Sequence, residues 1–211
     1  MAMSESRENA PRRRQQRGIE TQSALLEAAG RVFSRMEYDK AKLKDISDDA
    51  GISLGSLYFH FGNKDDVAAA VLDAQQERMT EVLSSVVETE GSSLGRLLDL
   101  LDGVAELISA DALVQAGIRL VGSLPDELKD RGYGFYEEWQ RVAETLIREG
   151  LEDGSVTTAR QTPAELAELV NELFVGAQVL AGMKDGWQTL PERIRRIRPV
   201  LESVLAPSSA A

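Results

Sequence analysis

Apolar residues recur every three or four positions along most of the chain, which is the spacing of one face of an α-helix. No stretch alternates strictly between apolar and polar residues over the length of a strand. The first apolar stripe consists of Leu25, Leu26, Ala29, Val32, Phe33 and Met36. It predicts a helix of about four turns that starts at Thr21 or an earlier residue. The pattern as a whole predicts an all-α protein.

Two short stripes follow, over residues 43–50 and 53–61, and a glycine separates them. Gly51 stands where the chain has to reverse direction, and Ser53 directly precedes the second stripe. Glycine adopts a positive φ at no steric cost, and serine is a good helix N-cap. The segment is therefore predicted to form two helices joined by a tight turn, a helix-turn-helix (HTH).

Six further stripes divide the remainder of the chain. The first should begin after the N-cap Asn63 and run to about Glu88. The others are predicted at 94–108, 111–121, 136–150, 166–177 and 194–205, with breaks at Pro125, Gly154, Pro163 and Pro191. About nine helices are expected in total.

The net charge of −11 by itself disfavours nucleic-acid binding, but the charge is distributed unevenly along the chain. Residues 11–64 hold ten Lys and Arg against seven Asp and Glu, whereas residues 65–211 hold thirteen against twenty-six. Phosphate repels the acidic part. Only the N-terminal segment is a plausible face for nucleic acid.

The composition removes several classes of function. The chain has no cysteine and a single histidine, so disulfides, thiolate nucleophiles and sulfur-bound zinc are excluded, and no metal site is expected. It shows no catalytic set and no glycine-rich phosphate loop, so we expect no enzyme and no cofactor. The N-terminus is polar and arginine-rich, and we expect a cytoplasmic protein without a membrane partner.

The second HTH helix has the chemistry of a recognition helix. Gly55 and Ser56 are small enough to let the backbone approach base edges, while Tyr58 and His60 can bond phosphates. A basic run near the N-terminus is either an arm on the DNA or a solvated tail, and His60 is either a phosphate ligand or solvated surface. The predicted DNA contacts are Arg14, Arg17, Lys42, Lys44, Ser53, Leu54, Gly55, Ser56, Tyr58, His60 and Lys64.

These residues carry a resemblance to a known family. Similarity to the N-terminal domain of TetR-family repressors lies in Phe33, Tyr38, Ile46, 50–53, Gly55, 57–61 and Lys64. Similarity to the γ-butyrolactone receptors of antibiotic-producing actinobacteria lies in 57–61, 72–75, 116–120, Trp139 and 173–177. The departures from the family pattern, at Glu37, Ala41, Lys42 and Leu54, bear on the operator sequence.

The resemblance implies an operator-binding repressor that a diffusible lactone, furan or antibiotic releases, in control of secondary metabolism or development. It divides the chain into a flexible basic arm at 1–16, an HTH DNA-binding domain at 17–64, a ligand-binding and dimerisation domain at 65–206 and a disordered tail at 207–211. The small residues Gly176, Ala177 and Ala181 favour a homodimer through the last two helices.

Trp139 matches the tryptophan of the receptors' ligand pocket, and its flat ring and single N–H donor suit a lactone. Plain core packing is the competing interpretation for Trp139 and for the apolar residues around it. The predicted ligand contacts are Trp139, Gln115, Val104, Leu107, Leu146, Phe174 and Gln178.

Two other functions stay open at this stage. One is a pseudo-receptor that responds to an antibiotic or another end product. The other is a protein-interaction module that keeps the fold without strong DNA binding, which Leu54 and the acidic body would favour.

Overall fold

The computed structural model describes residues 5–207 apart from 88, 125 and 159, with side chains from residue 15 onwards except 87, 126–133 and 135. Nine α-helices and no strand are present in this part of the chain. The helices form two compact units. The first contains residues up to Gln75 together with Gln115–Gly132, and the second contains Gln76–Val114 together with the chain from Tyr133 onwards.

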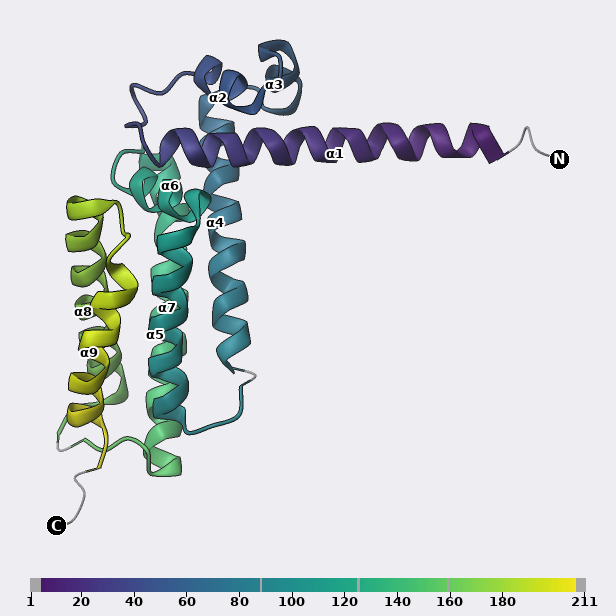
Figure 1. Cartoon of the computed structure of the whole chain (residues 1–211). Helices are drawn as coiled ribbons and strands as arrows, with labels where there is room; N and C mark the ends of the chain where they lie inside the picture. The colour runs from purple at the N-terminus through teal and green to yellow at the C-terminus, as the bar shows by residue number, and fades with distance from the viewer. Residues whose placement is uncertain (1–4, 88, 125, 159, 208–211) are drawn as a thin grey trace. The chain divides into compact units, whose positions relative to one another are not determined.

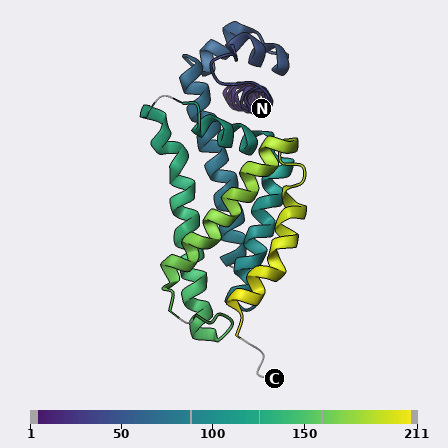
Figure 2. The ribbon, with the colours of Figure 1, turned by 90° about the vertical axis from the view of Figure 1, so that its left-hand side faces the viewer.

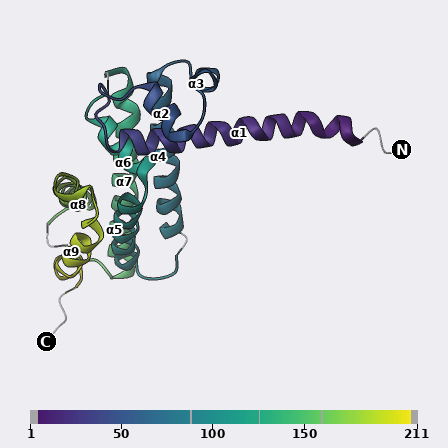
Figure 3. The ribbon, with the colours of Figure 1, turned by 45° about the horizontal axis from the view of Figure 1, so that its top comes forward.

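The first unit holds α1 (Glu5–Phe33), α2 (Leu43–Ala50), α3 (Leu54–His60), the start of α4 (Lys64–Val87) and most of α6 (Ala112–Val121). Both α2 and α3 contact α1, and they lie along its C-terminal part (Figures 1 and 3). The buried core residues of this unit include Leu25, Ala29, Val32, Phe33, Ile46 and Leu57. The predicted first stripe is therefore mostly the buried face of α1, except that Leu26 is half-buried and Met36 lies beyond the helix and is exposed.

Local capping explains where these helices begin and end. Gly51 has φ 66°, and its N–H bonds to the Asp48 carbonyl at 3.2 Å. The Ser53 hydroxyl accepts the Ser56 N–H at 3.2 Å, and the Asn63 side chain accepts the Asp66 N–H at 2.9 Å. The predicted glycine turn and both predicted N-caps are confirmed.

The second unit holds the end of α4, α5 (Ser93–Ala110), α7 (Asp126–Asp153), α8 (Pro163–Asp185) and α9 (Leu190–Leu205). Helices α8 and α9 lie side by side and run in opposite directions, and α9 also packs on α5 (Figure 2). Arg198 of α9 pairs with Asp102 and, at 2.9 Å, with Asp99, both on α5. An ion-pair network thus fixes α9 to α5.

Several helix bounds differ from the predicted ones. Helix α1 extends back to Glu5, so it includes residues expected in the flexible arm. Helix α7 begins ten residues before Tyr136, in a charged stretch without an apolar stripe. Helix α9 begins at Leu190, because Pro191 falls in its first turn, where proline is tolerated. The domain boundaries stay a prediction, and most of the predicted tail lies outside the described residues.

Helix α8 is unusually apolar for an outer helix. Among the described helices it alone is long and apolar enough, by length and composition, to cross a membrane. The buried core helix of a soluble protein meets the same criterion of length and composition. Four large apolar side chains of this helix are 49–81% exposed: Leu169, Val179, Leu180 and Met183.

Candidate DNA interface and ligand-binding region

Most of α3 faces away from the protein. Leu57 is fully buried and anchors the helix, and Phe61 just beyond it is 5% exposed. Ser53, Leu54, Gly55 and Tyr58 are all exposed. The structure therefore brings four of the predicted DNA contacts together on one open surface of a short, capped helix.

Gly55 has no role in the packing of the first unit. A Cβ atom added to it would meet no atom within 4 Å, and its φ does not lie in the left-handed region. Glycine within a helix costs roughly 0.5–1 kcal/mol relative to alanine. The packing of the unit therefore does not explain this glycine.

Phe59 was not among the predicted contacts, yet it is the most exposed large apolar side chain of the described residues, at 84%. Its ring meets the His60 ring edge-on, with 5.3 Å between centroids. Of the two phenylalanines in this run, only Phe61 is buried. An exposed aromatic ring beside polar groups suits contact with a thymine methyl or a sugar. The run of aromatic residues from Tyr58 to Phe61 was the signal in the sequence that could have identified Phe59 as a contact.

The basic side chains of α2 are partly engaged within the helix. Lys44 forms an exposed ion pair with Asp48 at 2.8 Å, which a phosphate can replace at little cost. Lys42 is the exposed N-cap residue, and its backbone N–H donates to the Asp45 carboxylate at 2.9 Å. Arg17 is exposed on α1, and the Arg14 side chain lies outside the described ones.

Lys64 is held inside the first unit. Its Nζ donates to the backbone carbonyl oxygens of Tyr38 at 2.9 Å and of Ala41 at 3.3 Å. The same ammonium lies 4.2 Å from the centroid of the Tyr38 ring. We predicted a phosphate contact for Lys64, but two of its three N–H donors already have protein acceptors.

The predicted ligand residues of the second unit lie mostly in its core. The Trp139 ring is 1% exposed and packs on Phe174, with 5.2 Å between ring centroids, so it joins α7 to α8. The Gln178 side chain is also buried and donates to the Tyr136 hydroxyl at 3.4 Å. Val104 and Leu146 are buried, and Leu107 is half-buried. The structure brings together an aromatic pair and two polar groups at α7 and α8.

Gln115 belongs to the first unit, whereas the other predicted ligand residues belong to the second. In the same unit α6 contacts α4 through a glycine. A Cβ on Gly117 would lie 3.0 Å from the Gln75 Cβ and closer still to its amide group, and the Gln75 side chain is 3% exposed. Glycine at 117 thus permits α6 to lie directly on α4.

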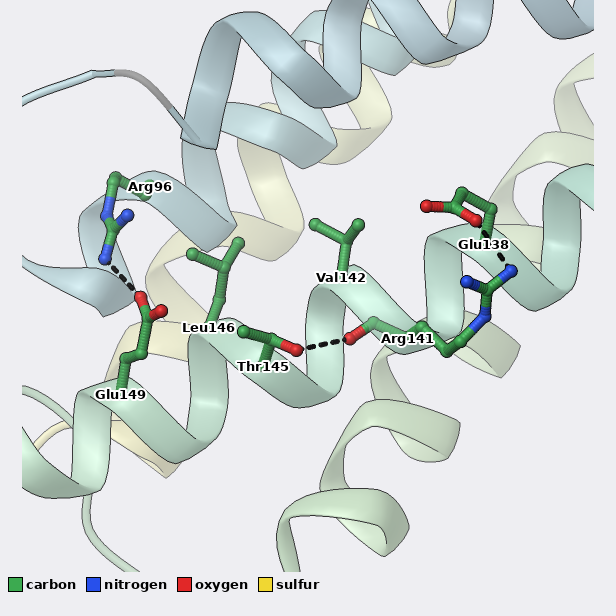
Figure 4. Close-up of a pocket in the computed structure, with 7 residues that line it drawn as sticks. All are labelled: Arg96, Glu138, Arg141, Val142, Thr145, Leu146 and Glu149. Atoms are coloured by element: carbon green, nitrogen blue, oxygen red, sulfur yellow. Dashed lines mark hydrogen bonds and ion pairs between the residues drawn. The ribbon is translucent and has the colours of Figure 1, made fainter.

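A charged groove of about 330 Å³ lies between α5 and α7. It is lined by Arg96, Glu138, Arg141, Val142, Thr145, Leu146 and Glu149 (Figure 4). An Arg96–Glu149 ion pair at 2.6 Å closes one end, and an Arg141–Glu138 pair at 2.6 Å lies at the other. Leu146 is the one predicted ligand residue that lines it. No group of three side chains able to hold a metal ion occurs among the described residues.

Comparisons with known proteins agree with this architecture. Residues 25–71 match the family model for bacterial regulatory proteins of the tetR family. The A-factor receptor protein of Streptomyces griseus is 27% identical over 199 residues, which cover 94% of this chain and 68% of that protein.

Two solved structures are similar over most of the chain. One is a γ-butyrolactone receptor described as ArpA-like, with a TM-score of 0.76, 25% identity and 91% of both chains covered. The other is TylP, a TetR regulator from Streptomyces fradiae, with a TM-score of 0.68, 28% identity and coverage of 91% of this chain and 89% of that one. The all-α fold with an N-terminal HTH, the family match and these relatives have one consistent explanation. The chain carries the N-terminal domain of bacterial regulatory proteins of the tetR family at residues 25–71, and over most of its length it has the fold of the solved γ-butyrolactone receptor and of TylP.

Proposed function

We propose that the protein binds a palindromic operator as a homodimer, inserts α3 into the major groove, and leaves the DNA when a γ-butyrolactone-like molecule binds around Trp139. The genes under its control would serve secondary metabolism or development, as the A-factor receptor resemblance suggests. The observation that carries the DNA-binding part is Gly55, an open glycine on an exposed helix face that nothing in the unit requires.

The Trp139–Phe174 contact supports a ligand site that works by separating helices. Because Trp139 is buried against Phe174, a molecule that takes its place beside the ring has to displace packed side chains. Buried Gln178 and the Tyr136 hydroxyl can orient a carbonyl or hydroxyl group of such a molecule. Helix α4 runs through both compact units, so a shift of its second half reaches the HTH. A coupling of about 1–3 kcal/mol is typical for such a switch.

The exposed face of α8 and α9 supports the dimer interface. Leu180 and Met183 of α8 and Val200 and Val204 of α9 are 57–81% exposed. Gly176 lies on the same helix with open space where a Cβ would be, as expected where a second helix approaches closely. A shallow hollow of about 460 Å³ is lined by Leu173, Gly176, Ala177, Leu180, Arg193, Arg196 and Ile197. A second copy that covers this face also accounts for the apolar character of α8 without a membrane.

The remaining parts of the proposal concern chemistry and location. We propose no enzymatic activity, because the relatives are named as regulators and receptors. A regulator that acts on chromosomal operators works in the cytoplasm, and we propose that location for this protein.

The proposal is tested by a gel shift on the DNA that flanks the protein's own gene, with and without a synthetic γ-butyrolactone. We expect a shift that the lactone abolishes. Gly55→Leu is the matched variant: it should remain folded, since the site is open, and should lose at least about tenfold in operator affinity. A gel shift that neither the lactone nor a culture extract changes would show that the proposed effector is wrong. If Gly55→Leu binds the operator as tightly as wild type, α3 does not lie in the DNA interface.

A further inference from the structure

The connection between α1 and α2 is bonded to the first turn of α4. Lys64 Nζ donates to the carbonyl oxygens of Tyr38 and Ala41, at 2.9 and 3.3 Å. The Tyr38 hydroxyl donates to the carboxylate of Asp65, the next residue of α4. We call these side chains and carbonyls, from Tyr38, Ala41, Lys64 and Asp65, the HTH clamp.

The clamp is partly buried and directional: Lys64 is half-buried and Asp65 is exposed. Tyr38 is 6% exposed, and its ring packs on Phe33 at a centroid distance of 5.9 Å. The Lys64 ammonium lies over the same ring, at 4.2 Å from its centroid, where a cation is attracted to the π-electrons. Burial and the bond to Asp65 raise the pKa of Tyr38 above its usual range, so the hydroxyl remains a donor.

The clamp fixes both ends of the HTH to one helix. At the exit, α3 leads through Phe61 into α4, and the Asn63 cap defines the start of α4. At the entry, Ala41, whose carbonyl is bonded to Lys64, lies two residues before the start of α2. Because both ends are held at the same turn of α4, the orientation of α3 follows that turn.

We propose that Lys64 and Tyr38 are positioning residues: they set the orientation of the recognition helix relative to α4 and thereby determine which half-site spacing the dimer accepts. Lys64 acts through backbone carbonyls of the protein and not through a phosphate. This inference rests on the proposed function, because spacing has meaning only for a dimer on two half-sites, which lie about 34–36 Å apart when one helical turn separates them.

The test compares two properties that a phosphate contact and a positioning residue change differently. The operator is first selected from random DNA with the wild-type protein. Affinity is then measured over a range of salt concentrations, on this operator and on versions with one or two base pairs inserted between the half-sites. A lost phosphate contact lowers the slope of log affinity against log salt by about one unit and leaves the spacing preference unchanged.

The variants are Lys64→Met, which keeps the length of the side chain, and Tyr38→Phe, which removes only the hydroxyl. For both we expect an unchanged salt slope and at least a threefold fall in the preference for the original spacing over the altered ones. Lys42→Met is the control, because Lys42 is exposed on α2 and bonds none of the clamp atoms; it should lower the salt slope and keep the spacing preference.

The outcomes separate the inference from the proposed function. If the wild-type protein selects no DNA sequence, the proposed DNA-binding function itself is wrong. Selection of a palindrome, followed by unchanged spacing preference in Tyr38→Phe and in Lys64→Met, would overturn the clamp. If Lys64→Met does not fold, Tyr38→Phe decides alone, since its ring keeps the packing on Phe33 and only the bond to Asp65 is lost.

Discussion

The two tryptophans of the chain are both buried, but their surroundings differ. Trp187 follows Gly186, has φ 70° and packs on Gly182, where an added Cβ would lie 2.8 Å from the indole ring. It fixes the turn between α8 and α9. Trp139 packs on Phe174 across two helices and has no such backbone constraint. Of the two tryptophans, Trp139 is therefore the one whose contact the proposed ligand could change, whereas the position of Trp187 is set by the turn between α8 and α9.

Replacement of Trp139 should separate ligand response from DNA binding. We expect Trp139→Ala to bind the operator within about threefold of wild type and to show no release by the lactone, while Trp139→Phe keeps part of the response. The measurement is a lactone titration of the protein–operator complex. Trp187→Phe leaves Trp139 as the only tryptophan, so its fluorescence should report lactone binding directly. If Trp139→Ala loses operator binding and folding together, Trp139 is core and not pocket.

Asp153 gives the stability of the second unit a defined pH dependence. Bonds from Ser155 and from the Ser93 N–H, at 2.9 Å, hold the pKa of its carboxyl well below the usual range, although the group is exposed. A lowered folded-state pKa means that the stabilisation is complete above the unfolded-state pKa near 3.8 and is lost as the pH falls below it. The urea midpoints of wild type and Asp153→Asn should therefore differ most at pH 6, and the difference should begin to shrink below about pH 4 and continue to shrink as the pH falls toward the much lower folded-state pKa. A constant difference across this range would contradict the assignment.

At the scale of elements, the sequence predicted helix ends best where a side chain bonds to the backbone a few residues away. Gly51, Ser53 and Asn63 end or cap helices within a few residues of themselves, so their roles could be inferred from spacing. The start of α7 could not, because its first turns carry few apolar residues and no periodic stripe. Helix α9 continues through Pro199, which a local rule would not allow in a helix interior. Packing of its buried residues Ile194 and Leu201 outweighs the lost hydrogen bond.

The internal role of Lys64 could not be predicted from sequence for a related reason. Its acceptors, the carbonyls of Tyr38 and Ala41, are 26 and 23 residues away along the chain. Backbone carbonyls are present at every residue, so only the fold shows which of them a lysine meets. The same holds for Gly117, whose neighbour Gln75 lies on another helix.

The contact between α4 and α6 provides a test of this packing. Gly117→Ala places a methyl group against the buried Gln75 side chain, and overpacking of this kind costs roughly 1–3 kcal/mol. We expect a lower melting temperature for Gly117→Ala and recovery of most of the loss in the double variant with Gln75→Ala. The control is Gly18→Ala, which has open space at its Cβ and should not lower stability. Additive losses in the double variant would mean that the two residues do not compete for space.

For the whole molecule, the charge distribution restricts which face can approach DNA, and the exposed apolar surface indicates which face a partner covers. The acidic second part of the chain is repelled by DNA, so only the N-terminal face can approach an operator. The exposed apolar residues of α8 and α9 lie in the other compact unit and need cover of their own. The homodimer that we propose would meet both demands, because it would cover the apolar face and present two recognition helices to one palindrome.

Disruption of this face should abolish operator binding without touching the HTH. A double variant, Leu180→Glu and Met183→Glu, places two like charges of each protomer into the proposed interface, where their desolvation opposes association. We expect sedimentation analysis to give a monomer, circular dichroism to give an unchanged helix content, and operator affinity to fall at least about a hundredfold, because a single HTH loses the contribution of the second half-site. Thr80→Glu, a charge added to the exposed face of α4, is the control and should stay dimeric. A monomeric variant that retains full affinity would show that one protomer suffices for the operator, and a variant that stays dimeric would place the interface elsewhere.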